Sequence, residues 1–188
     1  GKVDIAAVSA SEVSAAASSI ILGVAVGISH ADAAAVIGDY TTVTSGGAFG
    51  LAADVSNILD VSASANAGIN VFGQWYANIT TVTVPGPSLS VGVGIASSTS
   101  TATVADTAQI TAGSVGVSAD IANTFSTATK ADTKKPAKNF GVAVSFTFSE
   151  YDSEAVATLG GTVTATSGDV SVGASSVFEN NLSKTLSK

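Results

Sequence analysis

The chain has 188 residues, about the length of one domain, and it is 46% hydrophobic but only 11% charged, less than half the usual charged share of about 25%. It has no cysteine and a single histidine, His30, which excludes a thiolate nucleophile and metal sites rich in cysteine or histidine. The formal net charge of −7 and the lack of arginine argue against binding to nucleic acid and to anionic membranes.

The first part of the chain reads as the end of a repeat unit. Gly1 to Ser18 looks like the closing part of a unit whose front lies upstream, although the run Ser14 to Ser19 also has helical propensity. An uncharged stretch from Val13 to Ala31 has no basic start, and its apolar centre recurs later in the chain. We therefore expect neither a targeting signal nor a membrane span there.

Three copies of one pattern follow, at about residues 20–57, 90–123 and 141–180, and each copy contains three blocks in the same order. The first block reads GVAVGI, SVGVGI and GVAVSF in the three copies, at 23–28, 90–95 and 141–146. Apolar residues alternate with small or polar ones, which is the period of a strand with one buried face. The alignment predicts that Val26, Val93 and Val144 all face the core.

Glycines punctuate each copy at Gly46, Gly113 and Gly168, where we expect corners with positive φ. Repeated short strands with glycine corners predict an all-β parallel β-solenoid of about three degenerate repeats, each supplying about three turns. A β-sandwich also contains many short alternating strands, but it gives no reason for the same three blocks to recur in order.

Two inserts separate the copies. The first, residues 58–89, contains an aromatic cluster and its own alternating strand, Ile79 to Val84, which we expect to join the wall of the solenoid. The second, residues 124–140, contains four lysines around Pro136 and reads as an exposed loop.

The repeats resemble those of filamentous-haemagglutinin-like and related giant bacterial surface adhesins. The likeness rests on GVAVGI, on IGDYTTVTSGG, and on phrases such as Val-Thr-Ser-Gly at 43–46 and Val-Ser-Val-x-Ala at 170–174. It covers the three copies and leaves the segment around Trp75 unmatched. This resemblance implies a right-handed parallel β-helix, secretion, and a role as the stalk or contact surface of a long cell-surface protein.

The candidate catalytic and metal-binding residues have simpler structural interpretations. His30 lies near Asp32 and Ser29 in the sequence, but no shared architecture of the repeats supports these three residues as a catalytic set. Asp39 and Asp106 align with Gly161 of the third copy. Aspartate and glycine both suit a turn, but glycine has no carboxylate to bind a metal ion, so a turn is the simpler interpretation. The acidic run Glu150, Asp152 and Glu154 alternates, so it predicts one solvated face. We expect neither an enzyme nor a cofactor, and calcium is the one ion that the oxygen ligands of an acidic surface suit.

The candidate contact surface comes from the two inserts. Trp75 and Tyr76 beside Gln74 can stack on a sugar, or else fill a gap in the core. The lysines of the second insert can attract acidic glycans, or else form a solvated loop; they are Lys130, Lys134, Lys135 and Lys138. Asn78 and Asn181 head sequons, which matter only if the host glycosylates.

Taken with the resemblance, these features predict a non-enzymatic structural and adhesive segment of a secreted cell-surface protein, a rod of stacked coils without a transmembrane segment. Its expected partners are copies of itself, flanking repeats of a longer chain, and host or neighbouring-cell glycans or proteins. The alternative is a subunit of an extracellular filament or sheath assembled end to end or by strand addition. A polysaccharide-acting β-helix enzyme is a third class. We expect association through uncapped ends, weaker lateral contacts, and loss of folding in Val93→Asp.

Overall fold

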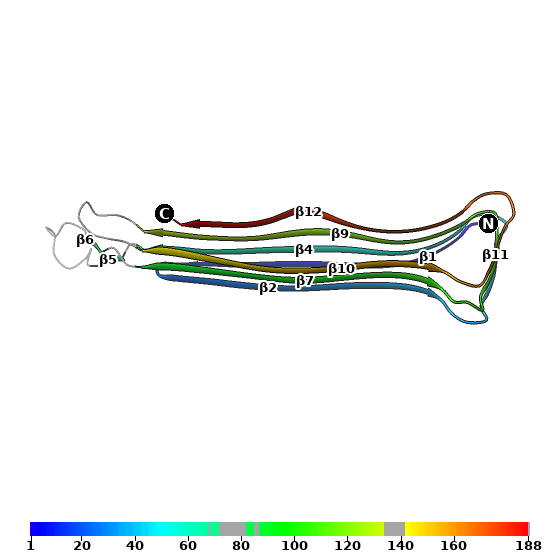
Figure 1. Ribbon diagram of the computed structural model, residues 1–188, viewed down its shortest axis with the longest axis horizontal. Helices are drawn as coiled ribbons and strands as arrows, with labels where there is room; N and C mark the ends of the chain where they lie inside the picture. The colour runs from blue at the N-terminus through cyan, green and yellow to red at the C-terminus, as the bar shows by residue number, and fades with distance from the viewer. Residues whose placement is uncertain (68, 72–81, 85–86, 134–141, 188) are drawn as a thin grey trace.

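The computed structural model describes residues 1–188 except 68, 72–81, 85–86, 134–141 and 188 (Figure 1). The described part is all-β. Its seven long strands are β1 (Val3–Ser19), β2 (Leu22–Ile37), β4 (Phe49–Ala67), β7 (Ser88–Val104), β9 (Val115–Thr133), β10 (Ala143–Leu159) and β12 (Val170–Ser187). The short strands are β3 (Thr42–Thr44), β5 (Ile69–Val71), β6 (Val82–Val84), β8 (Gln109–Ala112) and β11 (Thr162–Ala165).

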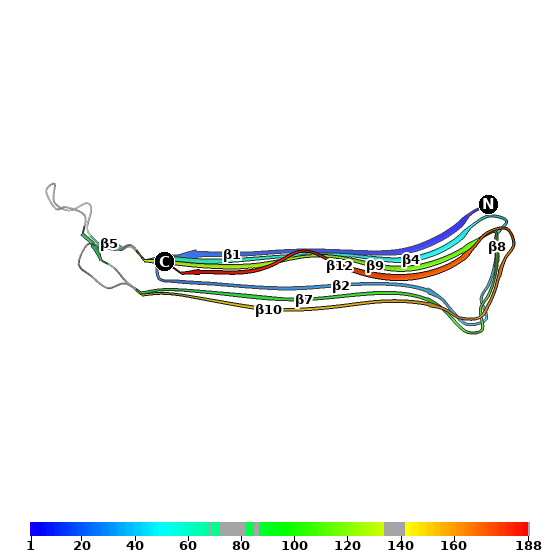
Figure 2. The same ribbon diagram turned by 45° about the horizontal axis from the view of Figure 1, so that its top comes forward.

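The strands stack into a parallel β-solenoid. One long sheet has the order β1-β4-β9-β12, the second long sheet has the order β10-β7-β2, and a short sheet has the order β11-β8-β3. The long sheets lie face to face, and the short sheet joins them at one end (Figures 1 and 2). Each repeat therefore supplies one coil of three strands, β2-β3-β4, β7-β8-β9 or β10-β11-β12, and the expected three turns per repeat are wrong.

Neighbouring coils pair in parallel and in register, which excludes the antiparallel sandwich. Val26 pairs with Val93 in the β10-β7-β2 sheet, and Phe49 pairs with Val115 in the other long sheet. Strand β1 pairs in register with β4. This pairing agrees with the expectation that residues 1–18 are the closing part of a repeat unit. The Ala-rich run 14–19 belongs to this strand and is not helical.

The expected inward valines are wrong. Val26 is 53% exposed, and Val93 points outward between the buried Gly92 and Gly94. In the third copy the true register is shifted by four residues, since Phe148 pairs with Val93 and Val144 pairs with Leu89. Alternation identified two faces correctly but assigned the wrong one to the core.

Large side chains from β4 and β9 explain this inversion. Leu59, Val61 and Phe125 are fully buried, and they project toward the β10-β7-β2 sheet. A Cβ atom added to Gly27 would lie 2.5 Å from Val61 Cγ2 and 2.8 Å from Leu59 Cδ1. In this part of the core, β4 and β9 therefore supply the large side chains while β2 and β7 offer glycine, alanine and serine, and the two sheets approach closely.

Polar side chains cross the core in a continuous chain of hydrogen bonds that alternates between the two long sheets. Ser11 and Ser29 hydroxyls lie 2.9 Å apart, and Ser29 Oγ donates to Asn57 Oδ1. The chain continues through Ser98, Asn123, Ser153 and Ser176. Asn57 and Asn123 are 0% and 1% exposed and fully engaged in this chain, which separates two apolar clusters. We call it the polar chain.

Two of the three glycine corners, Gly113 and Gly168, are closely packed, and none of the three has a positive φ. Gly46, Gly113 and Gly168 all follow the short strands, as expected, but their φ angles are not positive. A Cβ on Gly113 would lie 3.1 Å from the carbonyl oxygen of Gly47 in the coil below, so stacking there favours glycine. Among the described residues, positive φ occurs at Gly161 and at Tyr40, in the turns before the short strands.

The insert boundaries also change. Residues 58–67 continue β4, and residues 124–133 continue β9. Phe125 on β9 is completely buried, so the expectation of an exposed loop is wrong for residues 124–133. Val82–Val84 pairs antiparallel with Ile69–Val71 in a separate two-stranded sheet, so these residues of the expected strand do not join the wall, and residues 79–81 lie outside the described part of the chain.

Candidate interaction surfaces

The outer face of the β10-β7-β2 sheet carries a concentrated apolar surface near the starts of its strands. Val24, Val26 and Ile28 are 48%, 53% and 64% exposed, and Phe146 and Phe148 are 59% and 54% exposed. Their in-register neighbours on β7 are also apolar and point outward. We call this surface the apolar face; it consists of Leu22, Val24, Val26, Ile28, Leu89, Val91, Val93, Ile95, Val144, Phe146 and Phe148.

The same sheet becomes polar and acidic farther along its strands. Glu150, Asp152 and Glu154 are exposed on β10, while Tyr151 and Ser153 between them point inward. The expectation of one solvated acidic face is therefore confirmed. Glu150 pairs in register with Ile95, so the acidic surface begins in the last row of the apolar face, and the other charged groups that the structure describes on this outer face lie farther along the strands.

His30 lies on this face in a Ser–His–Asp arrangement that the sequence only partly indicated. Its Nδ1 is 2.5 Å from Ser97 Oγ and its Nε2 is 2.6 Å from Asp32 Oδ2. Asp32 was expected nearby, whereas Ser97 comes from the next coil and Ser29 points into the core. In-register pairing of β2 with β7 is the signal that would have identified Ser97.

This arrangement lacks the rest of a nucleophilic site. Ser97 sits in the middle of β7, which pairs with β2 on one edge and with β10 on the other. Its neighbouring backbone N–H groups are therefore used by the sheet, and in the described part of the chain no pair of them is free to hold an oxyanion. His30 and Asp32 are also 63% and 53% exposed, so water screens their interaction. The geometry is that of cross-strand polar pairing.

The aligned acidic positions Asp39 and Asp106 lie in turns, as expected. Asp39 Oδ1 accepts a hydrogen bond of 2.8 Å from Thr107 Oγ1, and the same hydroxyl accepts one of 2.9 Å from the backbone N–H of Tyr40. Gly161 occupies the corresponding turn of the third coil. Within the described ranges, no three carboxylate or imidazole side chains gather in a group that could hold a metal ion.

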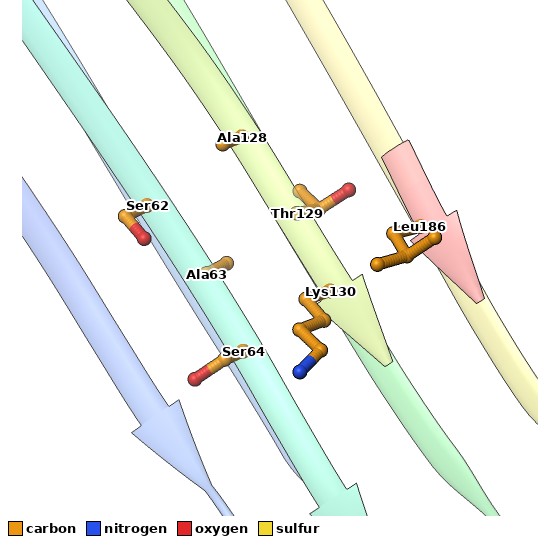
Figure 3. Close-up of a pocket in the computed structure, with 7 residues that line it drawn as sticks. All are labelled: Ser62, Ala63, Ser64, Ala128, Thr129, Lys130 and Leu186. Atoms are coloured by element: carbon orange, nitrogen blue, oxygen red, sulfur yellow. The ribbon is translucent and has the colours of Figure 1, made fainter. Parts of the chain in front are cut away.

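Of the candidate contact residues, the structure describes only Lys130. It lies at the end of β9, and its Nζ is 2.8 Å from Asp132 Oδ2. Beside it is a hollow of about 260 Å³ on the outer face of the four-stranded sheet (Figure 3). The hollow is lined by Ser62, Ala63, Ser64, Ala128, Thr129, Lys130 and Leu186. Gln74, Trp75, Tyr76, Lys134, Lys135 and Lys138 lie outside the described residues, as does Asn78.

Both ends of the stack expose inward-facing positions. One column of in-register residues runs through all four strands of the larger sheet, namely Ile5, Leu51, Val117 and Val172. The two middle residues are 1% and 2% exposed, whereas Ile5 is 38% and Val172 is 48% exposed. In the part of the chain that the structure describes, no strand pairs with the outer edge of β1 or of β12, so both edges present backbone groups together with apolar side chains.

No protein-family model, curated protein or solved structure matches the chain. In the described part of the chain, no helix is long and apolar enough to span a membrane.

Proposed function

We propose that this chain is a non-enzymatic structural and adhesive segment of a secreted bacterial cell-surface protein, in which stacked coils form a rod that carries contact surfaces. The observation that supports this proposal most strongly is the in-register coil-on-coil stack with open edges at both ends. A solenoid grows by adding coils, and each coil contacts only its neighbours, which suits a rod.

The residues that recur between coils have structural roles. Asn57 recurs as Asn123 in the polar chain, and the small inward residues of β2 recur in β7. By contrast, His30 has Ser97 and Asp152 at the corresponding positions of the other coils. The repeated features therefore support assembly of the stack, and the chemically reactive side chain does not recur.

The adhesive role is tested with acidic glycans and with intact producing cells. We expect antibodies against the chain to label the surface of intact cells, and beads coated with the chain to bind acidic glycans. Lys130→Ala should weaken this binding severalfold because it removes the cation beside the hollow. Lys2→Ala is the matched control, since Lys2 forms a similar exposed pair with Asp4 at 2.8 Å. Labelling only after cell lysis would refute the surface assignment, and equal binding by both variants would refute the lysine contact.

The open edges favour a second candidate, a filament subunit that assembles end to end. Edge strands β12 and β1 of successive copies would pair or be bridged by an added strand, and head-to-tail contacts of this kind produce open filaments. We expect Ile5→Asp to shorten or abolish filaments seen by electron microscopy, because it places a charge at the exposed end of an inward column. Val8→Asp on the same strand is the control, since Val8 is 74% exposed and points outward. Monomers at every protein concentration would contradict this candidate.

A further inference from the structure

Ser97, His30 and Asp32 have the contacts of a nucleophile, a base and a group that orients the base. His30 Nε2 lies 2.6 Å from Asp32 Oδ2, and His30 Nδ1 lies 2.5 Å from Ser97 Oγ. A carboxylate oxygen only accepts hydrogen bonds, so Nε2 carries the proton of the neutral imidazole and Nδ1 is left as an acceptor. The Ser97 hydroxyl therefore donates to Nδ1, which is the contact through which an imidazole removes the proton of an attacking serine.

These three residues lie where the apolar face meets the acidic surface. Ile28 and Ile95 occupy the outward row before Ser97, and Ile28 is 64% exposed. On the other edge of β7, the outward residues in register with Ile95 and Ser97 are Glu150 and Asp152. An apolar group can therefore lie on the isoleucines beside the hydroxyl, whereas the carboxylates disfavour an anionic group there.

We propose that Ser97 is an acylation site, which accepts an apolar acyl group from an activated ester with a neutral or cationic leaving group. His30 Nδ1 takes the hydroxyl proton as Ser97 Oγ forms a bond to the acyl carbon. The bond between that carbon and the leaving oxygen then breaks, and the imidazole returns the proton to the departing oxygen. The products are an O-acyl serine and a free alcohol or phenol, so atoms and charge balance without a further reactant.

The lack of a backbone oxyanion site limits this chemistry to a single transfer. Both edges of β7 are paired, so in the described part of the chain no free pair of N–H groups beside Ser97 stabilises a tetrahedral intermediate. An activated ester reacts because its leaving group departs easily, whereas the resulting acyl serine is an ordinary ester and hydrolyses slowly. Ser97 is therefore a stoichiometric acceptor, which agrees with the non-enzymatic role proposed above and adds a covalent attachment point to the rod.

The reaction is tested with p-nitrophenyl hexanoate, an activated ester with an apolar acyl chain and an uncharged leaving group. After incubation at neutral pH, peptide mapping by mass spectrometry should place the hexanoyl group on Ser97. Ser118 is the matched internal control, because it is an outward, half-buried serine on β9 that is likewise flanked by two paired strands, with Ala52 and Gly173 beside it. Equal acylation of the two serines would overturn the proposal, since it would report ordinary surface hydroxyls.

Two conservative variants test the path of the proton. His30→Gln keeps a hydrogen-bonding side chain beside Ser97 but cannot take its proton, so acylation of Ser97 should slow by at least about tenfold. Asp32→Asn should also slow it, because an amide N–H facing Nε2 favours the tautomer with the proton on Nδ1. Both variants should melt at the parent temperature, since His30 and Asp32 are 63% and 53% exposed, and the labelling of Ser118 should not change.

The acyl chain and the identity of the nucleophile are tested separately. The short ester p-nitrophenyl acetate should label Ser97 severalfold more slowly than the hexanoate, and equal rates would overturn the choice of an apolar acyl group. Acyl groups found on His30 and never on Ser97 would overturn the proposal, because the imidazole would then be the nucleophile. Acylation of Ser97 at the parent rate in His30→Gln would overturn it as well.

Discussion

Gly27→Val is expected to lower the melting temperature by about 10 °C, which corresponds to roughly 3 kcal/mol for a chain of this size. Valine is a good strand residue in general, so local propensity predicts no loss. The loss arises because the new Cβ alone would lie 2.5 Å from Val61 Cγ2 and 2.8 Å from Leu59 Cδ1. Leu59 and Val61 are fully buried, so neither can move into solvent without opening the space between the sheets.

The matched control is Gly173→Val on β12, where an added Cβ has no heavy atom within 4 Å. This variant should melt at or slightly above the parent temperature, because valine is favoured over glycine in a strand. A second change, Val61→Ala, should partly rescue Gly27→Val by making room, which a double-mutant cycle followed by thermal melting would reveal. If Gly27→Val melts like the parent, the two long sheets do not approach as closely as described.

Asn57→Asp is expected to destabilise the chain by about 3 kcal/mol or more at neutral pH, because it leaves a buried charge without a cation. Asn57 Nδ2 donates 3.0 Å hydrogen bonds to the carbonyl oxygen of Ser97 and to Ser98 Oγ. A carboxylate oxygen in that place would face the Ser97 carbonyl, acceptor against acceptor. The polar chain would break at its most buried position, since Asn57 is 0% exposed.

The same variant should show a defined pH dependence. Burial and the facing carbonyl raise the pKa of the introduced carboxyl above its unfolded value of about 3.9. When protonated, the carboxyl is neutral and can donate to the Ser97 carbonyl, so the loss of stability is smallest below about pH 4. The unfolded state loses its proton first as pH rises, so the destabilisation grows until the folded-state pKa is passed and then levels off.

Asn66→Asp provides the control for this series, since Asn66 is an exposed residue of the same strand, β4. Its unfolding free energy, measured by urea titration from pH 4 to 7, should follow that of the parent chain. Subtracting this control removes the titration of the other carboxylates. A pH-independent loss in Asn57→Asp would mean that the polar chain is open to water.

The sequence by itself determined the strand content, the parallel repeat and the positions of the turns. Side-chain parity is a local property of extended backbone, so Val24, Val26 and Ile28 were correctly placed on one face with Val91, Val93 and Ile95. The recurrence of three blocks in one order required equivalent positions to stack. The acidic residues 150, 152 and 154 were likewise placed together by alternation alone.

The tertiary structure decided which face of each strand is buried. In β2 and β7 the inward positions before the last residue of each strand are glycine, alanine and serine, and the valines of the first block face outward, because the opposite sheet already fills this part of the core with Leu59, Val61 and Phe125. Hydrophobicity alone could not reveal this, since small residues and valines are both compatible with a buried strand. Pairing between coils also brought Ser97 to His30 and joined Asn57 to Asn123 through Ser98. These contacts depend on the distance between the two sheets and on the register of coils 67 and 66 residues apart, as Val26↔Val93 and Asn57↔Asn123 show, and neither quantity is encoded in any single strand.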